Sequence, residues 1–241
     1  PTQANGEDYA SKIQKARHII TGLEYDVSNN IDFQLEAYIK DFSQLTNINR
    51  NMTSNDDETF IIETGVAKGI DALLKYNSKQ LYVWLVYSLG EVLRDDGVRE
   101  YSPHFDRRHN VNFVTSYKFG KKRDWKFDAR WNLGSGFPFT QTQGFYENIT
   151  FSNGINTDYT STNGDLGIQY AELNQGRLPY YHRLDLSLAK DFKFKNNTHL
   201  NVTASVTNAY NRENIFYFNR VKYERVNQLP LMPSLGMSLS F

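Results

Sequence analysis

The sequence has no cysteine among its 241 residues, which excludes a disulfide framework, a cysteine-ligated zinc site and a thiol nucleophile. Its 27 basic and 27 acidic residues cancel, so it lacks the long-range attraction to phosphate on which nucleic-acid-binding proteins depend. We therefore expect no nucleic-acid partner. Long apolar runs are also missing. The longest, Leu81–Tyr87, has seven residues, whereas a membrane-spanning helix needs about 20.

Aliphatic residues are scarce and aromatic residues are abundant. Apolar residues make up 39% of the chain, while 16 Tyr, 16 Phe and 3 Trp bring the aromatic share to 15%. A soluble domain of this size carries about 45–50% apolar residues and fills its interior with them. The segment Pro1–Ala10 is polar and has no features of a signal peptide, so we expect the chain to begin inside a longer protein.

What the sequence does contain is alternation of apolar and polar residues with a period of two. Trp125, Phe127, Trp131 and Leu133 share one face, and charged or amide side chains separate them. Such alternation is typical of strands with one apolar and one polar face. Nine strands and no helix are predicted, over Ala16–Val27, Ile31–Ile39, Phe60–Tyr76, Leu81–Val92, Asn110–Phe119, Trp125–Leu133, Arg183–Leu188, Leu200–Val206 and Leu235–Phe241.

The connections between these strands alternate in length. Short connections are predicted at Ser28–Asn30, Asn77–Gln80, Gly120–Asp124 and Lys193–Thr198, and long ones cover roughly Asp41–Glu58, Leu93–Arg108, Ser135–His182 and Asn211–Pro233. A transmembrane barrel sorts its connections in this way, with short periplasmic turns and long extracellular loops. A barrel also needs few aliphatic residues, because its outer face meets lipid and its rings lie at the membrane interfaces. The fold class predicted is all-β: an antiparallel transmembrane β-barrel portion in the outer membrane of a Gram-negative bacterium.

The chain also resembles the C-terminal barrel portion of a TonB-dependent outer-membrane receptor. The motifs that carry the resemblance lie in order along about 230 residues: Glu63–Tyr76 (ETGVAKGIDALLKY), Phe105–Asn112 (FDRRHNVN), Gly134–Thr140 (GSGFPFT), Arg177–Leu186 (RLPYYHRLDL) and Val206–Phe216 (VTNAYNRENIF).

The resemblance implies that residues 1–241 form about nine strands of a larger barrel of about 22 strands. The plug domain, the TonB box and the N-terminal strands of such a receptor are absent from this sequence. The implied function is active uptake of a scarce nutrient, this chain supplying barrel wall and extracellular loops. The implied partners are outer-membrane lipid, the remaining strands and plug of the same receptor, TonB through the absent plug region, the barrel-assembly machinery and a nutrient of unknown identity.

Two other functions remain open from the sequence. A smaller outer-membrane channel or adhesin barrel would show the same strands without a plug. A soluble carbohydrate-binding β-sandwich would also have strands with one wet face, and its loop aromatics would bind sugar.

No catalytic or metal-binding constellation is recognisable. His104 and His109 lie close to Asp106, but the local spacing supplies no convergent ligands or triad, so we expect a hydrogen-bonding cluster between strands, no enzyme activity, no metal and no cofactor. Asp95–Gly97 lacks the alternating acidic ligands of a calcium loop and is expected to be a solvated loop tip.

The long predicted loops are rich in aromatic residues that could stack on a ligand. An alternative is that these rings pack against other loops or anchor the protein at the interface. A hairpin is predicted there because Asn153–Gly154 lies between Tyr146–Phe151 and Ile155–Tyr159, with a second turn at Asn163–Gly164. The candidate ligand-binding residues are Phe137, Phe139, Tyr146, Tyr180 and Tyr181.

The last strand ends the chain with an aromatic residue. Leu235, Met237, Leu239 and Phe241 alternate with small residues, and such an ending resembles the signal that the barrel-assembly machinery reads by strand addition. The alternative is that Phe241 is one more interfacial anchor.

Overall fold

The computed structural model describes residues 13–51, 57–148, 164–195 and 198–241, and these residues form strands, turns and irregular segments without a helix. Among them no helix is long and apolar enough to cross a membrane. The strands are β1 (Lys15–Ser28), β2 (Ile31–Ile48), β3 (Phe60–Asn77), β4 (Leu81–Asp95), β5 (Glu100–Tyr101), β6 (His109–Phe119), β7 (Trp125–Gly134), β8 (Pro138–Phe139), β9 (Thr142–Asn148), β10 (Asp165–Tyr170), β11 (Gly176–Arg177), β12 (Tyr181–Lys193), β13 (His199–Thr207), β14 (Ile215–Asn219), β15 (Glu224–Asn227) and β16 (Met232–Ser240).

One large antiparallel sheet contains the nine predicted strands as neighbours in chain order, β1-β2-β3-β4-β6-β7-β12-β13-β16, with β5 added to β4. The predicted all-β antiparallel fold is thus confirmed. The largest difference is in β2, which continues beyond Ile39 to Ile48. A register shift between Phe42 and Leu45, with Gln44 at φ 59°, interrupts the alternation there. The period-two pattern ends before the strand does, because Asp41 already occupies a position of the apolar face and the bulge after Phe42 then moves the later residues to the opposite face.

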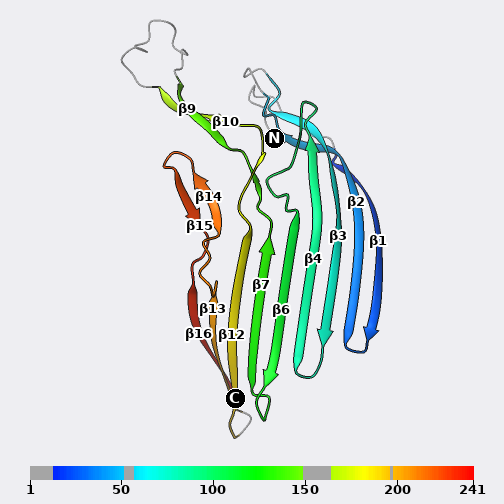
Figure 1. Ribbon diagram of the computed structural model, residues 1–241, viewed down its shortest axis with the longest axis vertical. Coiled ribbons are helices and arrows are strands. Elements are labelled where there is room, and N and C mark those ends of the chain that lie inside the picture. The colour runs from blue at the N-terminus through cyan, green and yellow to red at the C-terminus, as the bar shows by residue number, and fades with distance from the viewer. Residues whose placement is uncertain (1–12, 52–56, 149–163, 196–197) are drawn as a thin grey trace.

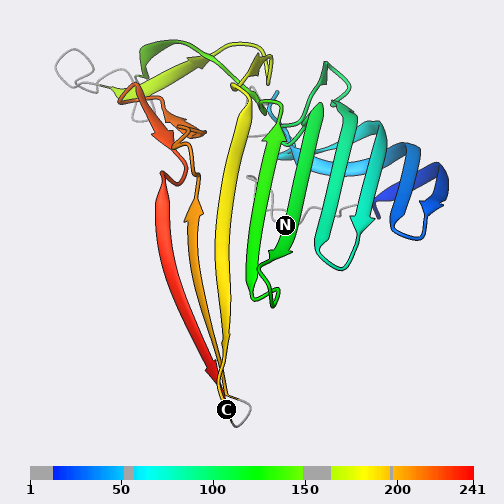
Figure 2. The same ribbon diagram turned by 60° about the horizontal axis from the view of Figure 1, so that its bottom comes forward.

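The connections segregate to the two ends of this sheet as the sequence predicts. We call the end where short connections join β1 to β2, β3 to β4, β6 to β7 and β12 to β13 the turn end, and the opposite end the loop end. Figure 1 shows the turn end and the C-terminus at the bottom, with the longer connections at the top. Figure 2 shows that the sheet follows a curved wall from β1 to β16.

The register places the apolar and polar residues on opposite faces of the sheet, because residues paired across strands point to the same side. The apolar face contains an unbroken row across six strands, formed by Phe33, Leu74, Leu85, Phe113, Trp131 and Leu184. On the polar face of β7, Arg130 is paired with Asp185 of β12, and Lys126 forms an ion pair with Asp128 at 3.0 Å. The alternation read from the sequence is therefore a property of the whole wall.

This sheet has no hydrophobic core. Among the described residues only Tyr101 and Ala129 are buried apolar residues, while the largest fully buried side chains are Glu63, Asn208 and Asp106. The accessible surface is 16640 Å², compared with about 11,000 Å² expected for a soluble monomer of this mass. A soluble β-sandwich would bury an apolar face between two packed sheets, so this arrangement argues against that alternative. The apolar face instead suits contact with lipid.

Three small two-stranded sheets, β8 with β11, β9 with β10 and β14 with β15, lie in the loop-end connections. The sequence predicts that the segment beginning at Tyr146 pairs with Ile155–Tyr159. This prediction is wrong for Tyr146, which pairs with Gly167 of β10. A Cβ at position 167 would lie 2.4 Å from the Tyr146 ring, so glycine allows the close approach that fixes this register. The predicted segment Ile155–Tyr159 and the turn at Asn153–Gly154 lie outside the described residues.

Candidate functional site at the loop end

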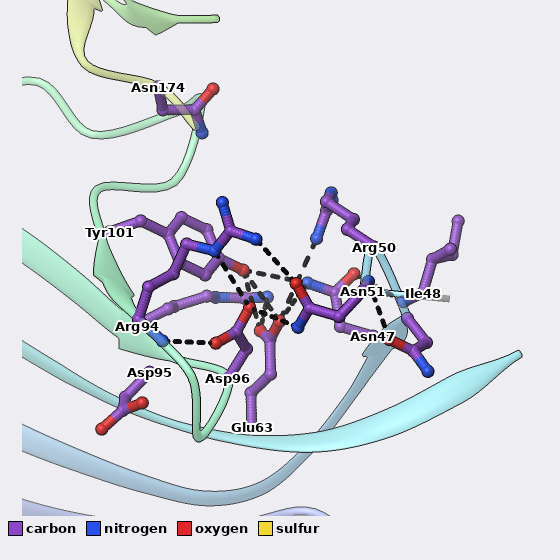
Figure 3. Close-up of polar contacts among 12 residues, drawn as sticks. Asn47, Ile48, Arg50, Asn51, Glu63, Arg94, Asp95, Asp96, Tyr101 and Asn174 are labelled. Atoms are coloured by element: carbon purple, nitrogen blue, oxygen red, sulfur yellow. Dashed lines mark hydrogen bonds and ion pairs between the residues drawn. The ribbon is translucent and has the colours of Figure 1, made fainter. Parts of the chain in front are cut away.

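A buried carboxylate joins four strands at the loop end (Figure 3). Glu63 of β3 is 1% exposed. Its Oε1 accepts hydrogen bonds from Asn47 Nδ2 and from the Tyr101 hydroxyl, both at 2.9 Å, and its Oε2 lies 3.4 Å from Arg94 Nη1. Arg50 Nη1 lies 4.0 Å from Glu63 Oε1. Burial and the nearby Glu63 raise the pKa of Tyr101, so its hydroxyl stays protonated and donates. The bases of these loops are therefore held together by a buried carboxylate, both oxygens of which have polar partners.

The turn after β4 is also ordered by a carboxylate. The Asp96 side chain is 3% exposed, and its Oδ1 accepts from the backbone N–H groups of Val98 and Arg99 at 2.9 and 2.8 Å. Burial acts to raise the pKa of Asp96, but these hydrogen bonds, with Asn51 and the Arg99 charge, bring it below its usual value. The expectation of a solvated tip is wrong for Asp96, because the turn folds its side chain inward. Asp95 is exposed.

A second buried carboxylate fastens the long connection between β7 and β12 to the wall. Asp106 is 1% exposed, and it accepts from the Val92 N–H at 2.8 Å and from Arg177 Nη2 at 2.6 Å. The first and last segments of the connection approach so closely that a Cβ on Gly136 would lie 1.5 Å from the carbonyl oxygen of Leu178. The end of this connection nearest the sheet is therefore attached to β4 through Asp106.

The expected hydrogen-bonding cluster around the histidines is confirmed for His109, whose Nδ1 lies 2.9 Å from the Tyr87 hydroxyl. His104 instead meets the ring of Phe105 edge-on at 5.3 Å. Within the described ranges, no three His, Asp or Glu side chains come close enough to hold a metal ion.

Two of the predicted ligand-binding residues, Phe137 and Tyr181, have their rings next to the guanidinium of Arg107. The guanidinium of Arg107 lies 4.1 Å from the Phe137 ring centroid and 5.7 Å from that of Tyr181, an arrangement that favours cation–π attraction. Burial lowers the pKa of Arg107, and its Nε has no hydrogen-bond partner. Ligand binding by Phe137 and Tyr181 stays a prediction, and the ring faces that meet Arg107 are already occupied.

The other three predicted residues lie in separate places. Phe139 packs against Phe218 with ring centroids 5.7 Å apart, and Tyr146 is 53% exposed in the β9–β10 hairpin. Tyr180 lines a cavity of about 420 Å³ together with His182. The five predicted rings therefore do not form one site.

The sequence analysis missed the polar residues that organise the loop end. Glu63 and Asp106 are single acids flanked by residues that give no metal or catalytic pattern, and their partners are far away in the sequence. No sequence signal marks Glu63, because it is in phase with Asp71 on the polar face of β3, where a barrel strand accommodates a carboxylate without a special partner.

The predicted assembly signal lies on the outermost strand. Leu239 and Met237 pair with Leu200 and Val202 of β13, which puts them on the apolar face. Leu235, Met237 and Leu239 are 68%, 70% and 58% exposed, and Phe241 is 97% exposed. In the described part of the chain, β1 and β16 each pair with one strand only, so both edges can accept a further strand. The assembly role of this segment stays a prediction.

A curved antiparallel wall with one apolar face, no hydrophobic core and its long connections at one end defines a portion of a transmembrane β-barrel. Comparison of the sequence with protein-family models gives no match, and comparison with curated proteins gives none either. Solved structures do match, and they are TonB-dependent outer-membrane receptors. The predicted recognition and fold class are therefore confirmed at the level of the fold.

Three of these structures illustrate the match. The ferripyoverdine receptor of the outer membrane of Pseudomonas aeruginosa, bound to ferripyoverdine, has a TM-score of 0.66 at 10% identity. The FpvAI–pyocin S2 complex has a TM-score of 0.64 at 12% identity, and the ferric-catecholate import receptor Fiu of E. coli K12, in a closed form, has 0.64 at 16% identity. Each match covers 98% of this chain and 28%, 28% and 29% of the respective receptor. The chain thus spans less than a third of their length.

Proposed function

We propose that the chain forms part of the barrel wall and extracellular loops of a Gram-negative outer-membrane receptor that imports a scarce nutrient with energy from TonB, and that it is not an enzyme. The observation that carries this proposal is that the distribution of residues is the reverse of that in a soluble domain. The apolar face is continuous and exposed, and the fully buried side chains include carboxylates at the loop end. A sheet with an exposed apolar face suits the wall of a large barrel in lipid. The ordered loop end suits the recognition of a ligand.

The matching receptors support the same function, because two of them are described by the iron chelates that they bind or import. In this proposal the remaining strands pair with β1 and β16, a plug domain fills the lumen beside the polar face, and TonB acts through the plug. The short turns lie in the periplasm and the loop end is extracellular.

The test is nutrient-limited growth of a Gram-negative host that carries the full-length receptor, with and without TonB. Iron chelates, cobalamin and oligosaccharides are offered singly as the limiting nutrient. We expect growth on one of them to require both the receptor and TonB, and the receptor to fractionate with the outer membrane. Growth that is independent of TonB would favour the smaller channel, and a monodisperse protein without detergent would exclude the membrane location.

A further inference from the structure

The loop end contains a cavity whose charged side chains are all basic. It has a volume of about 520 Å³, and the charged residues among its described walls are Arg50, Arg99 and Arg220. The uncharged lining residues include Thr140, Tyr170 and Leu173. A volume of about 300–1,000 Å³ is usual for a small-molecule site, and these residues come from four separate connections.

Neutral groups hold Arg220 in place without cancelling its charge. Its Nη1 donates to Thr142 Oγ1 at 2.7 Å and its Nη2 to the Thr140 carbonyl oxygen at 2.6 Å. Its guanidinium also lies 5.1 Å from the centroid of the Tyr170 ring. Among the described residues no carboxylate pairs with Arg220, so its positive charge remains available to an anion in the cavity.

The other two arginines are only partly neutralised. Arg99 Nη2 donates to Asn51 Oδ1 at 2.6 Å, and its Nε lies 3.8 Å from Oδ2 of the buried Asp96. Its second carboxylate contact, with Glu172 at 3.6 Å, involves a side chain that is 71% exposed. Such an exposed pair is weak. Arg50 reaches Glu63 only at 4.0 Å, and that carboxylate also accepts from Arg94. With Arg94 and Arg220, the described cluster has four arginines against the three carboxylates of Glu63, Asp96 and Glu172, so it retains one net positive charge.

We propose that this cavity binds a small oxyanion ligand, through carboxylate or phosphate groups held by Arg50, Arg99 and Arg220. Guanidinium groups match the planar, bidentate geometry of these anions. Because neutral acceptors already fix Arg220, little side-chain entropy is lost on binding. The inference rests on the proposed receptor function and names the chemical class of its ligand.

The test is calorimetric titration of the full-length receptor in detergent with citrate, with inorganic phosphate and with the neutral polyol sorbitol. We expect binding of at least one anion, weakened by added salt, and none of sorbitol. Binding of citrate alone assigns the site to carboxylates, and binding of phosphate alone assigns it to phosphate groups. Binding of neither anion overturns the inference.

Three variants and one matched control connect binding to this cavity. Arg220→Gln should weaken binding of the anion about 10- to 100-fold, as expected for loss of hydrogen bonds to a charged group, and Arg220→Lys should weaken it less because the charge remains. Arg50→Gln repeats the test at a residue with few contacts, in case Arg220→Gln fails to fold. Lys222→Gln removes the same charge from an exposed position on the β14–β15 turn and should have no effect. Unchanged binding in both Gln variants, or equal loss in Lys222→Gln, overturns the inference.

Nutrient uptake separates this inference from the proposed function. TonB-dependent growth together with unchanged anion binding in Arg220→Gln and Arg50→Gln would overturn the anion cavity and leave the receptor function intact. Conversely, citrate or phosphate binding that depends on Arg220, in a protein without TonB-dependent uptake, would support the cavity and contradict the receptor function.

Discussion

Two adjacent substitutions in β12, Leu186→Arg and Ser187→Arg, test the assignment of the faces. Leu186 pairs with Ala129 of β7 and Val206 of β13 on the apolar face, whereas Ser187 pairs with Asp128 on the polar face. The two positions have nearly the same depth in the wall, so the face is the main difference between them. An arginine at Ser187 also gains the nearby Asp128 carboxylate.

The depth of Leu186 determines the size of the effect. A rise of about 3.3 Å per residue and a tilt of about 40° place it about 15 Å along the membrane normal from Phe192 at the turn end, near the middle of the apolar band. Arginine facing lipid costs about 2–4 kcal/mol at the midplane and about 0–1 kcal/mol near the interfaces. Val202→Arg should cost less than Leu186→Arg, because Val202 lies nearer the turn end and pairs with Lys190.

The assay is urea unfolding of the full-length protein refolded into phospholipid vesicles, with heat-modifiable mobility in gels as the measure of the folded fraction. We expect Leu186→Arg to lower the free energy of unfolding most, Val202→Arg less and Ser187→Arg little. Equal losses at Leu186 and Ser187, or a larger loss at Ser187, would refute the assignment of the apolar face to lipid.

The remaining predictions concern the loop end and the C-terminus. Glu63→Gln should destabilise the loop end by about 1–3 kcal/mol, since its arginine partners lose a buried carboxylate, and limited proteolysis should then cut these loops sooner; unchanged cleavage would contradict this. Gly136→Ala should displace the backbone at Leu178 and expose this connection to protease, while Gly144→Ala, where a Cβ has room, should not. Deleting Phe241 should lower the amount of receptor assembled in the outer membrane, while inserted molecules unfold at nearly the normal temperature; the opposite result would indicate an anchor.

The wall was predictable from the sequence because each strand carries its own two-residue alternation. Trp125–Leu133, for example, shows both faces within one strand, and its neighbours repeat the pattern. The extent of β2 was not predictable, since Asp41 interrupts the apolar face and the bulge after Phe42 then reverses the alternation. The pairing of Tyr146 with Gly167 was equally hidden, because a local turn signal does not show which later segment will pair.

The loop end was harder to predict, because its contacts join residues that are distant in the sequence. Glu63 depends on Asn47 and Tyr101, which lie on other strands. The predicted rings were chosen by residue type within loops, and residue type does not indicate that Phe137 meets Arg107 while Phe139 meets Phe218. The three arginines of the cavity lie on three different connections, and residues of a fourth complete its lining.

The wall and the loop end are stabilised by different forces, and this difference bears on how such a receptor can change its ligand. The wall has an apolar face that lipid covers, so its stability depends on the alternation of side chains and tolerates exchange among apolar residues. The loop end depends on a few buried carboxylates, of which Glu63 and Asp106 are 1% exposed. Because these carboxylates fasten the bases of the connections, whereas Arg220 is held by the neutral oxygens of Thr140 and Thr142, a substitution at Arg220 can alter ligand preference while the loops remain attached to an intact wall.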